Sequence, residues 1–258
     1  MRQVQIFNVF TDQHSRGNPA AAVELSSWIA DDELLAISQQ YAQPVTAFVV
    51  KDGDDYHIRW FSLVTEINLC GHGTLAAAAL VFKRYPFSDQ PVVFNSPFGN
   101  LSVAKKGKDF SLSLPSWQGQ AVAADCDIVR SLAIEPLSMF KTRDLVVVLK
   151  DEQQVREFQP DLSLLTTMKD YHALIVTAKG EQCDYVLRYF PPKIGINEDP
   201  ATGSAQCSLA AYWFDVLNKP ILSVRQLSER GGAFLVEKNA DNRIKVTAEV
   251  TLGELISN

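Results

Sequence analysis

The stretch that decides the fold is Asp55-Tyr56-His57-Ile58-Arg59-Trp60-Phe61. It returns 129 positions later, which is half of the 258-residue chain, as Asp184-Tyr185-Val186-Leu187-Arg188-Tyr189-Phe190. The pair Ile67-Asn68 returns at the same offset as Ile196-Asn197. Two matches at one fixed offset are hard to reach by chance, so the sequence predicts an internal duplication.

Each copy has the pattern of a strand, a short turn and a helix. Tyr56–Phe61 and Tyr185–Phe190 are rich in the aromatic and aliphatic residues typical of strands. The helix-forming runs Thr74–Phe82 and Ser204–Trp213 follow, and each begins with a suitable N-cap residue. Both runs are almost wholly apolar, which predicts helices buried on all sides. We expect an α+β protein in which a buried central helix wrapped by strands is made twice.

The predicted boundary between the two halves lies near Pro115–Gln120, where Ser, Gly and Gln follow the predicted strand Phe110–Leu114. The N-terminal half is residues 1–117, with the last strand, residues 244–258, as a candidate addition to it. The C-terminal half is residues 118–243. Met1–Phe10 alternates apolar and polar residues and predicts a strand, not a signal peptide.

Composition bounds the function. With 47% apolar and 21% charged residues the chain is of the ordinary globular kind, and a net charge of -6 argues against nucleic-acid binding and polybasic membrane binding. Leu75–Phe82, the most apolar run, is too short to span a bilayer. Cysteines and histidines are scattered, which predicts a reducing, cytoplasmic setting and gives a zinc site no spacing support. They are Cys70, Cys126, Cys183, Cys207, His14, His57, His72 and His172.

Two turns precede the predicted helices: Cys70-Gly71-His72-Gly73-Thr74 and Asp199-Pro200-Ala201-Thr202-Gly203-Ser204. Free backbone N–H groups and the positive dipole end make a helix start an anion site. We expect the two turns to clamp a small carboxylate. The nucleotide fingerprints GxxxxGKS/T and GxGxxG do not occur. The alternative is that both are well-capped core helices.

Reactive side chains sit in both turns. A thiolate at Cys70 is favoured before a helix start, and His72 can exchange a proton near neutral pH. Asp199 stands 129 positions after Cys70, so the pseudo-twofold predicts that they oppose each other across one substrate, as proton transfer at carbon requires. The alternatives are an inert buried thiol, a solvated turn histidine and a polar turn at Glu198-Asp199.

These segments resemble the PhzF-like (phenazine biosynthesis) family, which is related in fold to diaminopimelate epimerase. The resemblance runs nearly the whole chain and is carried by Gly17–Val23, Cys70–Thr74, Gly195–Ala205, Arg230-Gly231-Gly232 and Gly253-Glu254-Leu255. It implies two β-barrel-like halves, each around a central helix, usually as a homodimer. It also implies no metal or organic cofactor, and isomerase chemistry that moves a proton on a small carboxylic acid.

Carried over residue by residue, the resemblance matches His72, Asp199 and Ser204 to family active-site positions. It matches Cys70 to the first catalytic thiol of the epimerases, with Asp199 in place of the second. The residues predicted to carry the proton transfer are therefore Cys70, His72 and Asp199. Those predicted to bind the substrate, partly through the amides at the two helix starts, are Asn18, Gly71, Gly73, Thr74, Thr202, Gly203 and Ser204.

One departure from the family pattern bears on the chemistry. The family normally has Ser-Glu-Thr-Ala-Phe, whose Glu is the main general acid/base, where this chain has Pro44-Val45-Thr46-Ala47-Phe48. Losing such a group typically costs about 10² to 10⁴ in rate. Ser62-Leu63 also stands in place of the family's usual Thr-Pro, and Gln206 stands where close relatives often have His.

Three hypotheses follow. The first is an isomerase- or epimerase-type enzyme acting on a small carboxylic acid. The second is a catalytically silent carboxylate-binding homologue, motivated by Val45. The third is a thiol enzyme or redox sensor at Cys70.

Overall fold

The computed structural model describes residues 3–84, 90–97, 99–123 and 135–253. Cys126 and the Glu254-Leu255 part of the C-terminal motif lie outside these ranges. The chain divides into two compact units, unit 1 (Met1–Ser113 with Val246–Asn258) and unit 2 (Leu114–Lys245). In the described ranges no helix has both the length and the apolar character needed to cross a membrane.

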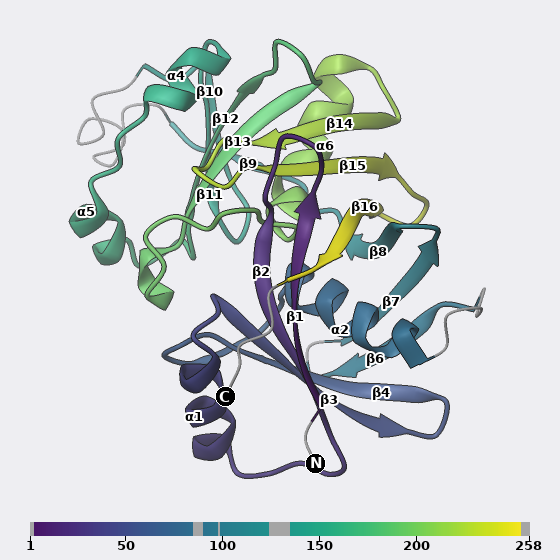
Figure 1. The fold of residues 1–258 in the computed structure, drawn as a ribbon. Helices are drawn as coiled ribbons and strands as arrows, with labels where there is room; N and C mark the ends of the chain where they lie inside the picture. The colour runs from purple at the N-terminus through teal and green to yellow at the C-terminus, as the bar shows by residue number, and fades with distance from the viewer. Residues whose placement is uncertain (1–2, 85–89, 98, 124–134, 254–258) are drawn as a thin grey trace. The chain divides into compact units, whose positions relative to one another are not determined.

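Unit 1 is a sheet that returns to its first strand. Its strands follow the order β1-β2-β3-β4-β6-β7-β8-β16, and β1 pairs in turn with β16, so the arrangement is barrel-like (Figure 1). The short β5 pairs with β4. The strands are β1 (Gln3–Thr11), β2 (Asn18–Leu25), β3 (Val45–Asp52), β4 (Asp55–Phe61), β5 (Glu66–Ile67), β6 (Val92–Ser96), β7 (Gly99–Lys106), β8 (Asp109–Pro115) and β16 (Arg243–Leu252).

Helix α2 (Gly71–Arg84) is the central helix of unit 1. It contacts β1, β2, β3, β6 and β7, and every residue from Gly71 to Phe82 is buried. Small alanine side chains let the strands approach the helix on all sides, as the sequence predicts. Helix α1 (Asp31–Tyr41) contacts β3 and β4 and buries Leu34 and Ile37 against Phe48 and Phe61.

Unit 2 also combines a sheet with one long, largely buried helix. Its strands follow the order β9-β10-β11-β12-β13-β14-β15-β16. Strands and helices are β9 (Gln120–Ala121), β10 (Ser138–Lys141), β11 (Leu145–Val148), α4 (Glu152–Glu157), α5 (Leu162–Thr167), β12 (Leu174–Lys179), β13 (Tyr185–Phe190), the 3₁₀ helix η1 (Pro192–Ile194), α6 (Ala205–Leu217), β14 (Ile221–Gln226) and β15 (Gly232–Lys238).

Helix α6 (Ala205–Leu217) extends beyond the predicted run, and its last turn is exposed. Residues 205–210, Trp213 and Phe214 are buried, but Asp215 is exposed and Val216 is 55% exposed. These two residues lie beyond the predicted run Ser204–Trp213, within which only Ala211 and Tyr212 are half-buried, and in α2 the whole predicted run Thr74–Phe82 is buried. The first two turns of α6 are as enclosed as those of α2.

The strand pairings confirm the predicted α+β class and two pseudo-symmetric halves. In unit 1, β2 pairs parallel with β3, with Ala20 opposite Val45, and β3 pairs antiparallel with β4. In unit 2, β11 pairs parallel with β12, with Leu145 opposite Leu174, and β12 pairs antiparallel with β13. Leu174, the first residue of β12, lies 129 positions after Val45, the first residue of β3. The offset of the repeat therefore also holds for the strands that precede β4 and β13.

Candidate functional site

The sulfur of Cys70 caps the start of α2. Cys70 directly precedes the helix, and the Gly73 backbone N–H donates to its Sγ at 3.3 Å. The prediction that Thr74 is the N-cap is wrong. Thr74 lies inside the first turn, where its Oγ1 donates to the Cys70 carbonyl oxygen at 2.7 Å. The Cys70 sulfur thus lies at the positive end of the α2 dipole, where it accepts a backbone N–H.

The imidazole of His72 is buried beside this sulfur. Its Nδ1 lies 3.4 Å from Cys70 Sγ, and its Nε2 has no hydrogen-bond partner among the described residues. Burial lowers the pKa of His72 to about 3, so the ring is neutral at physiological pH and does not titrate near neutral pH as the sequence suggests. A neutral imidazole has one donor and one acceptor nitrogen, and here one of the two is left for a ligand.

Three side chains of the site approach the backbone of Gly73 closely. A Cβ placed on Gly73 would lie 2.8 Å from Trp60 Cδ1, 3.1 Å from Cys70 Sγ and 3.2 Å from Val45 Cγ1. These three side chains therefore converge on one backbone position. The indole Nε1 of Trp60 is also buried without a partner in the described part of the chain. Val45 itself is 1% exposed, so the position where the resemblance expects a glutamate is closed by an isopropyl group.

The turn before α6 is tied down by side chains. Thr202 Oγ1 donates to Asp199 Oδ2 at 2.5 Å. The amide of Gln226, at the end of β14, accepts from the Thr202 N–H at 2.8 Å and donates to the Asp199 carbonyl at 2.6 Å. Sequence reasoning missed Gln226, because its role depends on a strand that pairs far away along the chain. Asp199 and Thr202 are both buried, and these hydrogen bonds join the turn to the end of β14.

Ser204 occupies the N-cap position of α6, but its side chain does not cap the helix. Its φ of -68° and ψ of -20° are helical, whereas a capping residue is usually extended. The capping role predicted for Ser204 is therefore wrong. Backbone amides at both helix starts donate to no described residue: Gly71, His72, Gly203 and Ser204. Free amides of this kind are what an anion requires.

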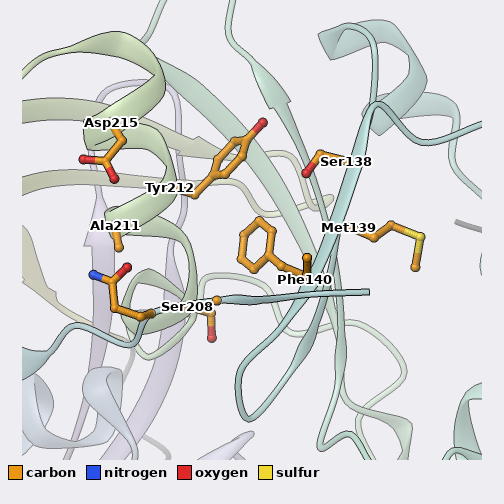
Figure 2. Close-up of a pocket in the computed structure, with 10 residues that line it drawn as sticks. Ser138, Met139, Phe140, Ser208, Ala211, Tyr212 and Asp215 are labelled. Carbon is orange, nitrogen blue, oxygen red and sulfur yellow. The ribbon is translucent and has the colours of Figure 1, made fainter. Parts of the chain in front are cut away.

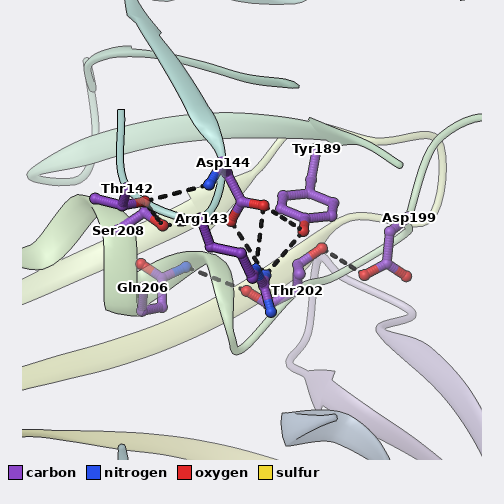
Figure 3. Close-up of polar contacts among 8 residues, drawn as sticks. All are labelled: Thr142, Arg143, Asp144, Tyr189, Asp199, Thr202, Gln206 and Ser208. Carbon is purple, nitrogen blue, oxygen red and sulfur yellow. Dashed lines mark hydrogen bonds and ion pairs between the residues drawn. The ribbon is translucent and has the colours of Figure 1, made fainter. Parts of the chain in front are cut away.

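A polar network around the buried Asp144, which the sequence did not predict, lies in unit 2 (Figure 3). Arg143 Nε and Nη2 donate to the two carboxylate oxygens of Asp144, at 3.2 and 3.1 Å, and Nη2 also donates to the Tyr189 hydroxyl at 3.0 Å. Ser208 Oγ, on α6, donates to Asp144 Oδ2 at 3.3 Å and lies 2.7 Å from Thr142 Oγ1. Burial raises the pKa of Tyr189 well above its usual value, so its hydroxyl stays protonated.

A cavity of about 250 Å³ opens elsewhere in unit 2 (Figure 2). Phe140 and Tyr212 stack on its wall with ring centroids 5.2 Å apart, and Ser138 and Asp215 contribute polar atoms. None of the residues predicted from the sequence lines this cavity. Ser208, which also lines it, is the link between the cavity and the Asp144 network.

The predicted residues thus form two local groups. Unit 1 brings Cys70, His72, Gly71, Gly73 and Thr74 together at the start of α2, and Asn18 is buried at the start of β2. Unit 2 brings Asp199, Thr202, Gly203 and Ser204 together before α6. That Cys70 and Asp199 act on one substrate stays a prediction. Within the ranges described, no group of three or more His, Cys, Asp and Glu side chains is placed to hold a metal ion.

Comparisons with known proteins agree on the family. The chain is 47% identical over 247 residues to an uncharacterized isomerase of Vibrio cholerae, covering 96% of this chain and 88% of the relative. A PhzF family protein of Enterococcus faecalis, known from its crystal structure, matches with a TM-score of 0.90 and 36% identity over 97% of this chain and 96% of that one. A hydroxyproline epimerase from Agrobacterium vitis shares the fold at a TM-score of 0.57 and 9% identity, over 97% and 89% of the two chains. The family model of phenazine biosynthesis-like proteins matches residues 7–252, and the chain belongs to that family.

Proposed function

We propose that this protein is an isomerase-type enzyme that moves a proton at carbon on a small carboxylic acid. The observation that carries the proposal is the His72 ring, buried beside Cys70 Sγ with its Nε2 unpartnered among the described residues. A buried polar atom without a partner needs an explanation, and a ligand atom supplies one. The Vibrio cholerae relative is named an isomerase, which supports the reaction class.

The start of α2 is suited to hold the carboxylate. The amides of Gly71 and His72 are free of described partners, and the helix dipole adds its positive end. The hydroxyproline epimerase of the same fold has trans-4-hydroxy-L-proline bound, which is itself a small carboxylic acid. A carboxylate held there places its neighbouring carbon close to the Cys70–His72 pair.

The proton transfer needs one base and one acid. The base takes the proton from carbon, the C–H electron pair delocalises toward the bound carboxylate or an adjacent double bond, and the acid returns a proton to the other face or another carbon. No atoms are gained or lost. In this proposal Cys70 and His72 supply one of these groups and Asp199 supplies the other, as the repeat at 129 residues predicts.

Deuterium incorporation tests the proposal. Small amino acids, hydroxy acids and unsaturated acids are incubated with the protein in D₂O, and carbon-bound deuterium is followed by NMR. We expect incorporation into at least one acid, and a loss of about 10² or more in rate for Cys70→Ala and for Asp199→Asn. Cys183→Ala is the matched control, because Cys183 is a half-buried thiol whose pKa burial raises to about 11. Absence of deuterium across the panel refutes the enzyme.

A second candidate function is a silent carboxylate-binding homologue. The buried Val45 favours it, because no proton can be carried at that position. Such a protein gains thermal stability from the same acids without incorporating deuterium. Turnover by the wild-type protein rules this candidate out.

A further inference from the structure

We infer that Arg143 binds a second carboxylate of the substrate, so that the substrates are dicarboxylic acids. This inference rests on the proposed function, because it concerns the far end of the same acid. It starts from the position of Arg143 in the repeat and from the hydrogen-bond donors that its guanidinium leaves unused.

Arg143 is the unit 2 counterpart of Asn18. Ala20 pairs with Val45 in unit 1, and Leu145 pairs with Leu174, 129 positions after Val45, in unit 2. Two residues before Ala20 stands Asn18, and two residues before Leu145 stands Arg143. The sequence predicts Asn18 to bind substrate. The same place in the duplicated frame therefore carries a cation in unit 2.

Hydrogen bonds to Asp144 and Tyr189 fix the Arg143 guanidinium and leave some of its N–H donors unused. Arginine has five N–H donors. Nε and Nη2 serve Asp144 and the Tyr189 hydroxyl, whereas the two N–H groups of Nη1 donate to no residue that the structure describes. The side chain is 29% exposed, so a ligand can reach it. A fixed guanidinium edge suits the two oxygens of a carboxylate.

Arg143 lies next to the turn that precedes α6. Its guanidinium lies 5.3 Å from the centre of the Trp117 ring, and the Trp117 N–H donates to the Cys207 carbonyl in the first turn of that helix. Tyr189 joins the two places, because its hydroxyl accepts from Arg143 while its backbone carbonyl accepts from the Asp199 N–H. Arg143 and the turn before α6 are thus linked through one tyrosine within unit 2, and this proximity supports a role for Arg143 at the substrate.

The competing explanation is that Arg143 only neutralises the buried carboxylate of Asp144. Under that explanation a ligand carboxylate gains nothing from Arg143. Matched ligands separate the two cases: succinate, glutarate and adipate, and the monoamide of each, which has the same shape but one carboxylate fewer. Binding is measured by titration calorimetry on the full-length protein.

We expect the wild-type protein to prefer at least one diacid over its monoamide by about 10- to 100-fold. Arg143→Gln should abolish that preference, and Arg143→Lys should weaken it, because an ammonium group lacks the guanidinium fork. Arg156→Gln is the control, since Arg156 is an exposed arginine of unit 2 paired with Glu152. If Arg143→Gln does not fold, Arg143→Lys carries the test.

The outcomes separate this inference from the function on which it rests. Deuterium exchange on monocarboxylic acids, with equal binding of diacid and monoamide, overturns the role of Arg143 and leaves the isomerase proposal standing. If neither the wild-type protein nor any variant binds a diacid or a monoamide, and no deuterium is exchanged, the role of Arg143 and the isomerase proposal are both overturned. A diacid preference that survives in Arg143→Gln also overturns the inference.

Discussion

Val45→Glu places a carboxylic acid in a closed, apolar part of the candidate site. Val45 is 1% exposed, and its Cγ1 lies beside Gly73 together with Cys70 Sγ and the Trp60 ring. The matched control is Val45→Gln, which has nearly the same shape and no charge. We expect Val45→Gln to lower the free energy of unfolding by about 2–4 kcal/mol, because it adds volume and buries an amide.

The glutamate variant should show an additional loss that grows with pH. Burial disfavours the carboxylate, so the pKa of the new side chain is higher in the folded protein than its value of about 4.3 in the unfolded chain. Above about pH 4.3 the unfolded chain releases the proton while the folded protein keeps it, so stability falls as pH rises toward the folded pKa. The slope is at most about 1.4 kcal/mol per pH unit, or about 3 kcal/mol between pH 5 and pH 7.

Urea unfolding of the two variants at pH 5, 6, 7 and 8 measures this difference. Subtracting the glutamine curve removes the effects of volume and of all other titrating groups. Parallel curves for the two variants would refute the reasoning, since they would mean that position 45 is solvated. In the same samples deuterium exchange tests whether a glutamate at 45 raises the rate, as the family pattern predicts.

Three further predictions follow from the buried polar groups. Burial lowers the pKa of His72 to about 3, so the unfolded chain takes up a proton before the folded protein does as pH falls. The free energy of unfolding should therefore drop from about pH 6.5 downward. In urea unfolding at several pH values, His72→Asn should remove this pH dependence. Trp60→Phe removes an indole N–H that has no described partner, together with part of a fully buried ring. It should lower the free energy of unfolding by about 1–3 kcal/mol through lost packing and weaken carboxylate binding, and a larger loss would mean that the N–H is satisfied. Asp144→Asn leaves the charge of Arg143 without its carboxylate and should lower the free energy of unfolding in urea by about 2–4 kcal/mol. Adding Arg143→Gln to this variant should recover part of that loss. If the losses of the two substitutions simply add, the pairing of the two residues is contradicted.

Local patterns in the sequence predict the framework of this protein well. The repeat at 129 positions predicts the strands β4 and β13 and the helices that follow them, because strand and helix signals are short-range. Ser204 stands at the N-cap position of α6 as predicted, whereas the N-cap of α2 was predicted wrongly for a physical reason. Oxygen side chains are the usual caps, and here a thiol takes that place while the threonine hydroxyl bonds to a carbonyl one turn back.

The contacts that position the site are long-range, and one sequence does not reveal them. Gln226 reaches the Asp199 turn from 27 positions away, and Tyr189 lies 46 positions from Arg143. In the sequence, Arg143-Asp144 has the appearance of an ordinary polar turn. Only the pairing of β11 with β12, and of β12 with β13, brings these residues together.

The duplication explains why the two units share a frame, and the differences within that frame bear on the substrate. At equivalent positions unit 1 has Cys70 and Asn18, whereas unit 2 has Asp199 and Arg143. Unit 1 thus offers a thiol with a neutral imidazole and a neutral amide, and unit 2 offers a carboxylate and a guanidinium. An enzyme that only inverts one carbon has use for equivalent groups on its two sides. Unequal groups suit a transfer in which the proton leaves one position of the acid and returns to another, which is the reaction that the proposed function describes.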